Sequence, residues 1–159
     1  MKSARITYIA VLSALAVVFG YIESLFPLPI AIPGIKLGIS NIVILFALIK
    51  MNKSDAFFIL IIKVLVCSLL FSGINSLFYS FSGGIMSFFA MILVLKFGLS
   101  IIGTSMAGGV FHNLGQIFMA SIILGSFSAF YYLPVLLLSG LIVGGIVGLL
   151  CKTVISRLK

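Results

Sequence analysis

Apolar residues run almost continuously along the chain, and charged residues or clusters of proline and glycine interrupt them at intervals. The runs do not alternate with polar residues, so the pattern indicates helices rather than the strands of a barrel. The interruptions predict six helical spans, at residues 5–22, 35–49, 56–71, 84–95, 100–124 and 132–153. Several spans are shorter than the roughly 20 residues that cross a bilayer, so we expect their ends to extend into the flanking segments.

Two connecting segments are distinctive. Residues 23–36 contain three prolines, Pro27, Pro29 and Pro33, which disfavour a helix. This segment is also too apolar for a solvated loop, so we expect it to fold back onto the membrane, where it can act as a lid. Residues 72–84, SGINSLFYSFSGG, are rich in serine and glycine and are predicted to form a polar loop.

The composition supports a membrane location. The chain is 63% hydrophobic and 8% charged, whereas soluble domains are roughly 45–50% apolar and about 25% charged. So few charged residues cannot cover a water-facing surface. The predicted fold is therefore an all-α integral membrane protein of six transmembrane helices, forming a single domain over residues 1–159.

The basic residues set the predicted topology. With six spans, both termini lie on the same side of the membrane. That side is predicted to be cytoplasmic by the positive-inside rule, because it collects Lys2, Arg5, Lys50, Lys53, Lys96, Lys152, Arg157 and Lys159. The other side carries Lys36 and Glu23, and Lys63 falls within the third span.

The sequence offers little for catalysis. Its two acidic residues, Glu23 and Asp55, are predicted on opposite sides of the membrane, so no paired-carboxylate or carboxylate–metal centre is expected. There is no nucleotide-binding fingerprint, and Cys67 and Cys151 are expected near opposite faces. We therefore expect no metal, no cofactor and no catalytic residue. The scattered basic residues do not suggest nucleic-acid binding.

Lys63 is unusual because a cation near the middle of a transmembrane span is costly, by at least about 2.5–3.5 kcal/mol on insertion scales. One interpretation is that its ammonium group extends to the membrane surface. The other is that it faces an internal cavity, where it pairs with an anionic ligand or with Glu23.

A second polar group interrupts the fifth span, in the stretch GVFHNLGQ at residues 109–116. Helical spacing places Ser105, Gly109, His112 and Gln116 on one face, with Asn113 at its edge. These groups must face the protein interior, and Gly108 and Gly109 are expected to leave room beside His112. They form either an interhelical hydrogen-bond cluster or the wall of a ligand cavity. Further candidates for this cavity and its outer mouth are Asn41, Lys36, Asn75 and Ser82.

Small residues one turn apart occur in the first span, at Ala10 and Ala14. Such spacing lets another helix approach closely, either from the same chain or from a separate membrane subunit. Spacing alone favours packing within the chain.

Three motifs carry a family resemblance: IPGIKLGISNI at 32–42, SFSGGIMSF at 80–88 and GGVFHNLGQ at 108–116. They resemble the Gx transporter family, whose members are often labelled heptaprenyl diphosphate synthase component I. That family is similar to the substrate-binding S components of energy-coupling factor (ECF) transporters of prokaryotic cell membranes. The resemblance implies a six-helix bundle that binds a vitamin-like solute near the outer face. It also implies docking on a transmembrane T component, energised by ATPase subunits, through an Ala-xxx-Ala face that Ala10 and Ala14 match.

Three functions follow as hypotheses. The first is an ECF-type membrane subunit that binds a small, anionic or vitamin-like solute from outside in an outward cavity. Its expected binding residues are Lys36, Asn41, Lys63, Ser82, His112, Asn113 and Gln116. The second is a non-catalytic membrane subunit serving prenyl diphosphate or quinone metabolism, with a prenyl chain in an apolar cavity and its diphosphate at Lys63 or Lys36. The third is a proton-coupled carrier using His112. An enzyme is disfavoured, because prenyl diphosphate synthases use aspartate-rich motifs and this chain has one aspartate.

Overall fold

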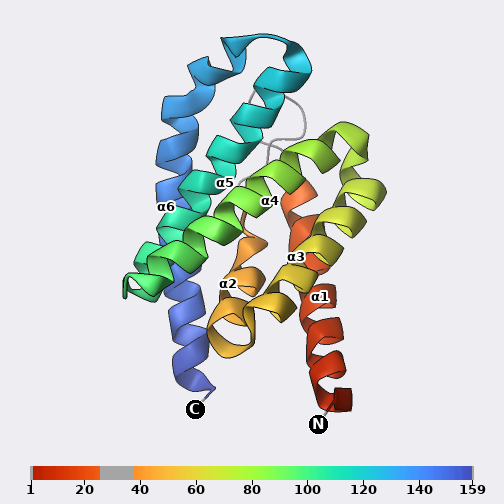
Figure 1. The fold of residues 1–159 in the computed structure, drawn as a ribbon, viewed down its shortest axis with the longest axis vertical. Coiled ribbons are helices and arrows are strands. Elements are labelled where there is room, and N and C mark those ends of the chain that lie inside the picture. The colour runs from red at the N-terminus through yellow and green to blue at the C-terminus, as the bar shows by residue number, and fades with distance from the viewer. Residues whose placement is uncertain (1, 26–37, 159) are drawn as a thin grey trace.

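The computed structural model describes residues 2–25 and 38–158, apart from the side chain of Lys2. Every regular element in these ranges is helical (Figure 1). The elements are α1 (Lys2–Leu25), α2 (Asn41–Lys50), α3 (Lys53–Cys67), the π-helix η1 (Ser68–Ser72), α4 (Gly73–Lys96), α5 (Ile101–Leu124), the 3₁₀-helix η2 (Phe127–Tyr132) and α6 (Leu133–Arg157). The predicted lid and Lys36 lie outside the described residues.

The length and composition of four helical stretches allow them to cross a membrane, so the chain is an all-helical membrane protein. These stretches are Ser3–Leu25, Lys53–Lys96, Ile101–Leu124 and Phe127–Arg157. The helix α2 has 10 residues and therefore a length of about 15 Å, roughly half the thickness of a bilayer core. The count of six complete spans therefore stays a prediction.

The prediction of a loop over residues 72–84 is wrong. Helix α4 begins at Gly73, and the π-helix η1 joins it to α3 in one continuous helical stretch. Gly73 has a φ of +78°, a left-handed conformation that glycine adopts readily, and it marks the change of direction between the two helices. Serine and glycine usually signal a turn, but here Gly83 and Gly84, which lack side chains, are buried at helix interfaces.

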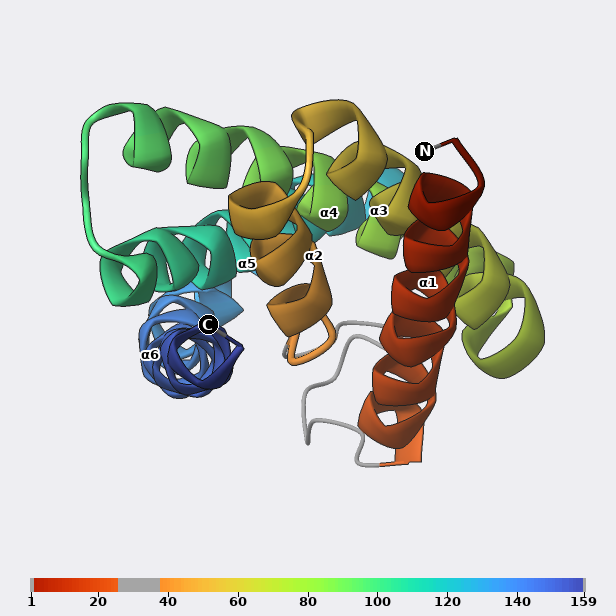
Figure 2. The same cartoon turned by 90° about the horizontal axis from the view of Figure 1, so that it is seen from below.

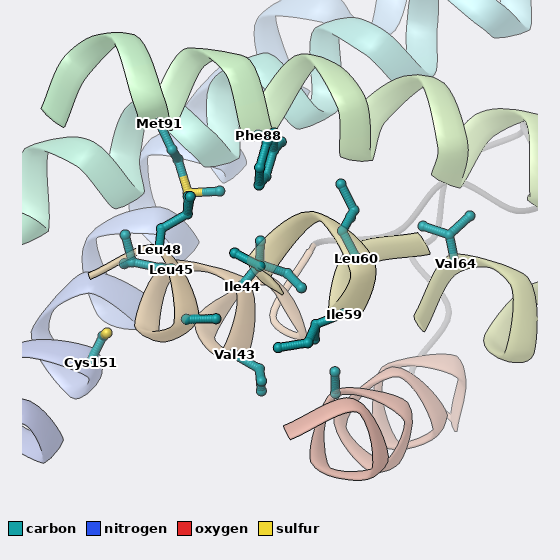
Figure 3. Packing of buried hydrophobic residues seen from close by; sticks show 13 residues of the cluster. Val43, Ile44, Leu45, Leu48, Ile59, Leu60, Val64, Phe88, Met91 and Cys151 are labelled. Carbon is teal, nitrogen blue, oxygen red and sulfur yellow. The ribbon is translucent and has the colours of Figure 1, made fainter. Parts of the chain in front are cut away.

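The short helix α2 lies at the centre of the described structure and contacts α1, α3, α4, α5 and α6. Its side chains Ile44 and Leu45 are at most 1% exposed. Figure 3 shows these residues beneath Phe88 and Met91 of α4, with Ile59 and other residues of α3 beside them. From Ile42 to Ile49 the sequence of α2 is apolar on all sides, and neighbouring helices cover it except along an edge that includes the partly buried Ile42 and Phe46.

Helices α4, α5 and α6 pack closely side by side, and glycines make this possible (Figure 2). A Cβ atom on Gly115 of α5 would lie 2.8 Å from the Cα of Gly83 in α4. On the other face of α5, a Cβ on Gly109 would lie 2.3 Å from the carbonyl oxygen of Gly140 in α6. Backbones this close leave no space for side chains, as small-residue interfaces in membranes require.

The two chain ends lie at the same end of the molecule, as the predicted topology requires (Figure 1). Near this end, the guanidinium group of Arg5 donates hydrogen bonds to both carboxylate oxygens of Asp55, with Nε 3.0 Å from Oδ1 and 2.9 Å from Oδ2. This ion pair connects α1 to the first turn of α3. Which side of the membrane these ends face stays a prediction.

Two neighbouring glycines of α6 provide a test of this packing. Gly144→Ala should destabilise the protein, by about 1–3 kcal/mol, because the added Cβ would lie 2.7 Å from the Ser105 carbonyl oxygen. Gly145→Ala is the matched control, since its Cβ would come no nearer than 3.9 Å to Met106 Cγ. Thermal unfolding in detergent measures both variants, and equal midpoints would contradict the close α5–α6 contact.

Candidate functional site

Buried polar side chains gather where the end of α1 and the start of α2 meet α3, α4 and α5. Glu23 of α1 is 5% exposed. Its carboxylate accepts hydrogen bonds from the backbone N–H of Gly38 and from Ser40 Oγ, the latter at 3.0 Å. Both donors lie in the turn before α2, and Glu23 supplies acceptors for them in the protein interior.

Lys63 enters the same region from α3. Its side chain is buried, and its ammonium group donates a hydrogen bond to Asn41 Oδ1 at 3.1 Å. The ammonium group therefore does not extend to the membrane surface. Asn41 is the first residue of α2, and its buried Nδ2 has no hydrogen-bond partner among the described residues. One side chain thus receives a hydrogen bond from the lysine and still presents an unused donor.

His112 of α5 lies between two glycines from other elements. A Cβ atom on Gly38 would lie 3.1 Å from His112 Cδ2, and one on Gly83 of α4 would lie 3.1 Å from Cε1. The expectation that Gly108 and Gly109 make room for the ring is therefore wrong. Those two glycines instead allow the close approach of Met91 in α4 and of Gly140 in α6, respectively.

These side chains enclose a small cavity, which we call the polar cavity. It measures about 10 Å³, which is about the space of one water molecule. Its lining brings together Glu23, Ser40, Lys63, Cys67, Ser80 and His112. A second cavity of about 10 Å³ lies beyond Gly38 and Asn41, toward Ser105 and Gly144. The arrangement can hold a small polar group between an ammonium, a carboxylate and an imidazole.

Two other predicted binding residues instead join helices. Asn113 Nδ2 donates to the carbonyl oxygen of Leu136 at 2.6 Å and to Ser139 Oγ at 3.3 Å, both in α6. Ser82 Oγ donates to the carbonyl oxygen of Gly115 at 2.8 Å, from α4 to α5. Both side chains satisfy groups at helix interfaces and neither lines the polar cavity.

Gln116 is fully buried against α4. A Cβ added to Gly83 would lie 2.9 Å from its Cγ, so the stem of the glutamine fills the space that this glycine leaves. Gln116 does not line the polar cavity. Asn75, expected at an outer mouth, is exposed on α4.

Sequence reasoning named Glu23 only as a possible partner of Lys63 and missed its bonds to the turn before α2, and it missed Ser40 and Ser80 altogether. A signal for the helix start was present, since Gly38, Ser40 and Asn41 precede an apolar run, which is the usual pattern of a helix start. The sequence does not show that the partner of this helix start is a carboxylate 17 residues earlier.

The two acidic residues of the chain both have structural partners. Glu23 binds the start of α2, and Asp55 binds Arg5. Within the described ranges, no group of three or more His, Cys, Asp and Glu side chains could hold a metal ion. Neither carboxylate is placed beside a second acid.

Comparison with known protein families shows to which family this chain belongs. The sequence model of heptaprenyl diphosphate synthase component I matches residues 12–154, which is most of the chain. The chain belongs to this family. No curated protein and no solved structure gave a match. Residues from all three motifs that carried the resemblance meet in the structure. Gly38 comes from the first motif, Gly83 from the second and His112 from the third.

The heptaprenyl diphosphate synthase component I match covers the polar cavity completely, from Gly20 to His112. Of the two exposed alanines of α1, it covers Ala14, whereas Ala10 lies two residues before its start. Ala10 and Ala14 are exposed, so their side chains are not buried against another helix of the described structure, contrary to what their spacing alone had suggested.

The helix start at Glu23 can be tested directly. Glu23→Ala should loosen the first turn of α2, because Gly38 N–H and Ser40 Oγ lose their acceptor and a lost hydrogen bond costs about 1 kcal/mol, or about fivefold in an opening equilibrium. Hydrogen exchange of the Asn41, Ile42 and Val43 amides, which bond to the carbonyls of residues 38–40, reports this turn. Ser24→Ala is the control, since Ser24 Oγ bonds within α1, to the carbonyl oxygen of Tyr21. Unchanged exchange in Glu23→Ala would show that the carboxylate does not hold α2.

Proposed function

We propose that this protein is a non-catalytic membrane component that serves prenyl diphosphate synthesis. The observation that carries the proposal is the family match over residues 12–154 to heptaprenyl diphosphate synthase component I. The family name refers to one component of a synthase, so the protein is expected to work with at least one further subunit. The helices place it in a membrane, which we propose is the cell membrane of a prokaryote, with the basic chain ends in the cytoplasm.

The placement of the carboxylates supports a non-catalytic part. Diphosphate chemistry commonly depends on Mg²⁺, which proteins bind through carboxylates together with the phosphate oxygens. Asp55 is already held by Arg5, and Glu23 by Gly38 and Ser40. A bound diphosphate would therefore find cations and hydrogen-bond donors but no free carboxylate for a metal ion. Another subunit must supply the catalytic acids.

Reconstitution tests this division of labour. The protein in nanodiscs, given Mg²⁺, farnesyl diphosphate and isopentenyl diphosphate, should form no longer prenyl diphosphate. Addition of a soluble prenyl diphosphate synthase subunit from the same organism should give product and should bring that subunit to the nanodiscs. Empty nanodiscs are the control for recruitment. Chain elongation by the protein alone, or no recruitment and no change in the soluble subunit's activity, would contradict the proposal.

A second candidate function is solute capture for an ECF-type transporter, which the family match does not itself support. The observation in its favour is the closed polar cavity with Lys63, Glu23 and His112, together with the outward-facing Ala10 and Ala14. A T component could approach α1 closely at these alanines, with ATPase subunits supplying the energy.

Co-purification distinguishes this second candidate from the first. Ala10→Trp and Ala14→Trp should abolish association with a co-expressed T component, because an indole ring would separate the two helices. Tyr8→Trp is the matched control, as Tyr8 is 65% exposed on the same helix and lies about 160° around the helix axis from Ala10. If wild-type protein does not co-purify with the T component, or if the alanine variants still do, docking through this face is excluded.

A further inference from the structure

A second and larger hollow lies on the opposite side of α2 from α4, between α1, α2 and α6, and we call it the apolar groove. Its volume is about 310 Å³, within the range of about 300–1,000 Å³ that is typical of ligand sites. Figure 2 shows α1 and α6 on either side of α2 here. Its walls include Leu15, Phe19, Ile42, Phe46, Val154 and Leu158.

The chemistry of the groove selects a hydrocarbon chain. All of its lining side chains are aliphatic or aromatic except for the thiol of Cys151. A polar ligand would leave its own donors and acceptors unsatisfied there, at a cost of several kcal/mol. The outer surface of the helices is also apolar, but the groove is a hollow that can surround a chain on three sides. The groove and the polar cavity share no lining residue.

The charged residues at one end of the groove indicate what kind of headgroup the bound hydrocarbon chain carries. Its lining extends to the last turns of α6, where Lys152 follows Cys151 in the sequence and Arg157 precedes Leu158, and both basic residues are exposed. Neither α6 nor α2 contains an acidic residue, and α2 ends at the exposed Lys50. An anionic headgroup at this end would meet cations with no competing carboxylate from these two helices, and arginine binds phosphate groups particularly well.

We infer that the apolar groove binds the isoprenoid chain of a prenyl diphosphate, with its diphosphate group at Lys152 and Arg157. This inference rests on the proposed function and gives that function a binding site. The sequence hypothesis placed the diphosphate at Lys63 or at Lys36, which lies outside the described residues. Lys63 is not suited to it, because it is buried beside Asn41 and lines a cavity of about 10 Å³ that cannot admit a prenyl chain.

Photocrosslinking locates the chain. The protein in nanodiscs is incubated with a farnesyl diphosphate analogue that carries a diazirine at the end of its chain, and labelled peptides are mapped by mass spectrometry. The label is expected on groove-lining residues of α1, α2 or α6, and unlabelled farnesyl diphosphate should compete with it. Farnesol, which lacks the diphosphate, should compete at least about tenfold less well, since it cannot form the charge-assisted hydrogen bonds of the diphosphate.

Two sets of variants test the two ends of the site. Val154→Trp should fill the groove and abolish saturable labelling. Val135→Trp, on the same helix but away from the groove, should leave the labelling intact. Val154 is 46% exposed and Val135 is 62% exposed, so both positions can accept an indole ring. The double variant Lys152→Gln and Arg157→Gln should weaken competition by farnesyl diphosphate about tenfold and leave that by farnesol unchanged. Lys96→Gln, an exposed cation at the end of α4, is the control for loss of charge.

The outcomes separate this inference from the proposed function. Saturable labelling that Val154→Trp does not reduce, or that maps near Lys63 and His112, would overturn the groove assignment while prenyl diphosphate binding remained. Equal competition by phosphatidylcholine would make the groove a general site for lipid chains and would also overturn the assignment. No saturable binding of the farnesyl diphosphate analogue would overturn both.

Discussion

The structure depends on one requirement, that the backbone donors at the start of α2 find acceptors inside a membrane protein. Water cannot supply these acceptors in a hydrocarbon environment, so the protein must. Glu23 does so for the turn that precedes α2, by accepting hydrogen bonds from the backbone N–H groups of Gly38 and Ile39 and from the hydroxyl group of Ser40. This contact fixes the end of α1 to the start of α2, and it brings Asn41 to Lys63. The polar cavity is a consequence of satisfying a helix end in the interior.

The opposite side of the molecule is held by contacts of a different kind. Helices α4, α5 and α6 approach through glycines, and hydrogen bonds from Ser82 and Asn113 to backbone carbonyls reinforce the two interfaces. Because Gly83 and Gly115 touch across the α4–α5 interface, the imidazole of His112 keeps a fixed place against α4. Packing here and hydrogen bonding at α2 therefore determine one site together, although they involve different helices.

The sequence was sufficient to predict the helices and the burial of polar groups, because a membrane interior penalises exposed charge strongly. It could not assign each polar group to a partner. His112 and Asn113 are adjacent, yet a rotation of about 100° per residue along the helix directs one toward Gly38 and the other toward α6. Which helix occupies each direction depends on tertiary packing. Similarly, the serines and glycines of residues 73–84 predicted a loop, because their preference for turns is visible in sequence and their use in helix packing is not.

The separation of polar and apolar sites has a functional consequence. Carboxylates are the groups that would let this chain hold a metal ion on a diphosphate, and the fold commits both of them to structural contacts. Cations, in contrast, remain exposed at the end where the apolar groove reaches the last turns of α6. Under the proposed function, a chain with this distribution holds an amphipathic anion by its tail and its charge and leaves its activation to another subunit. Such a division of labour would account for a protein with two acidic residues in a synthase family.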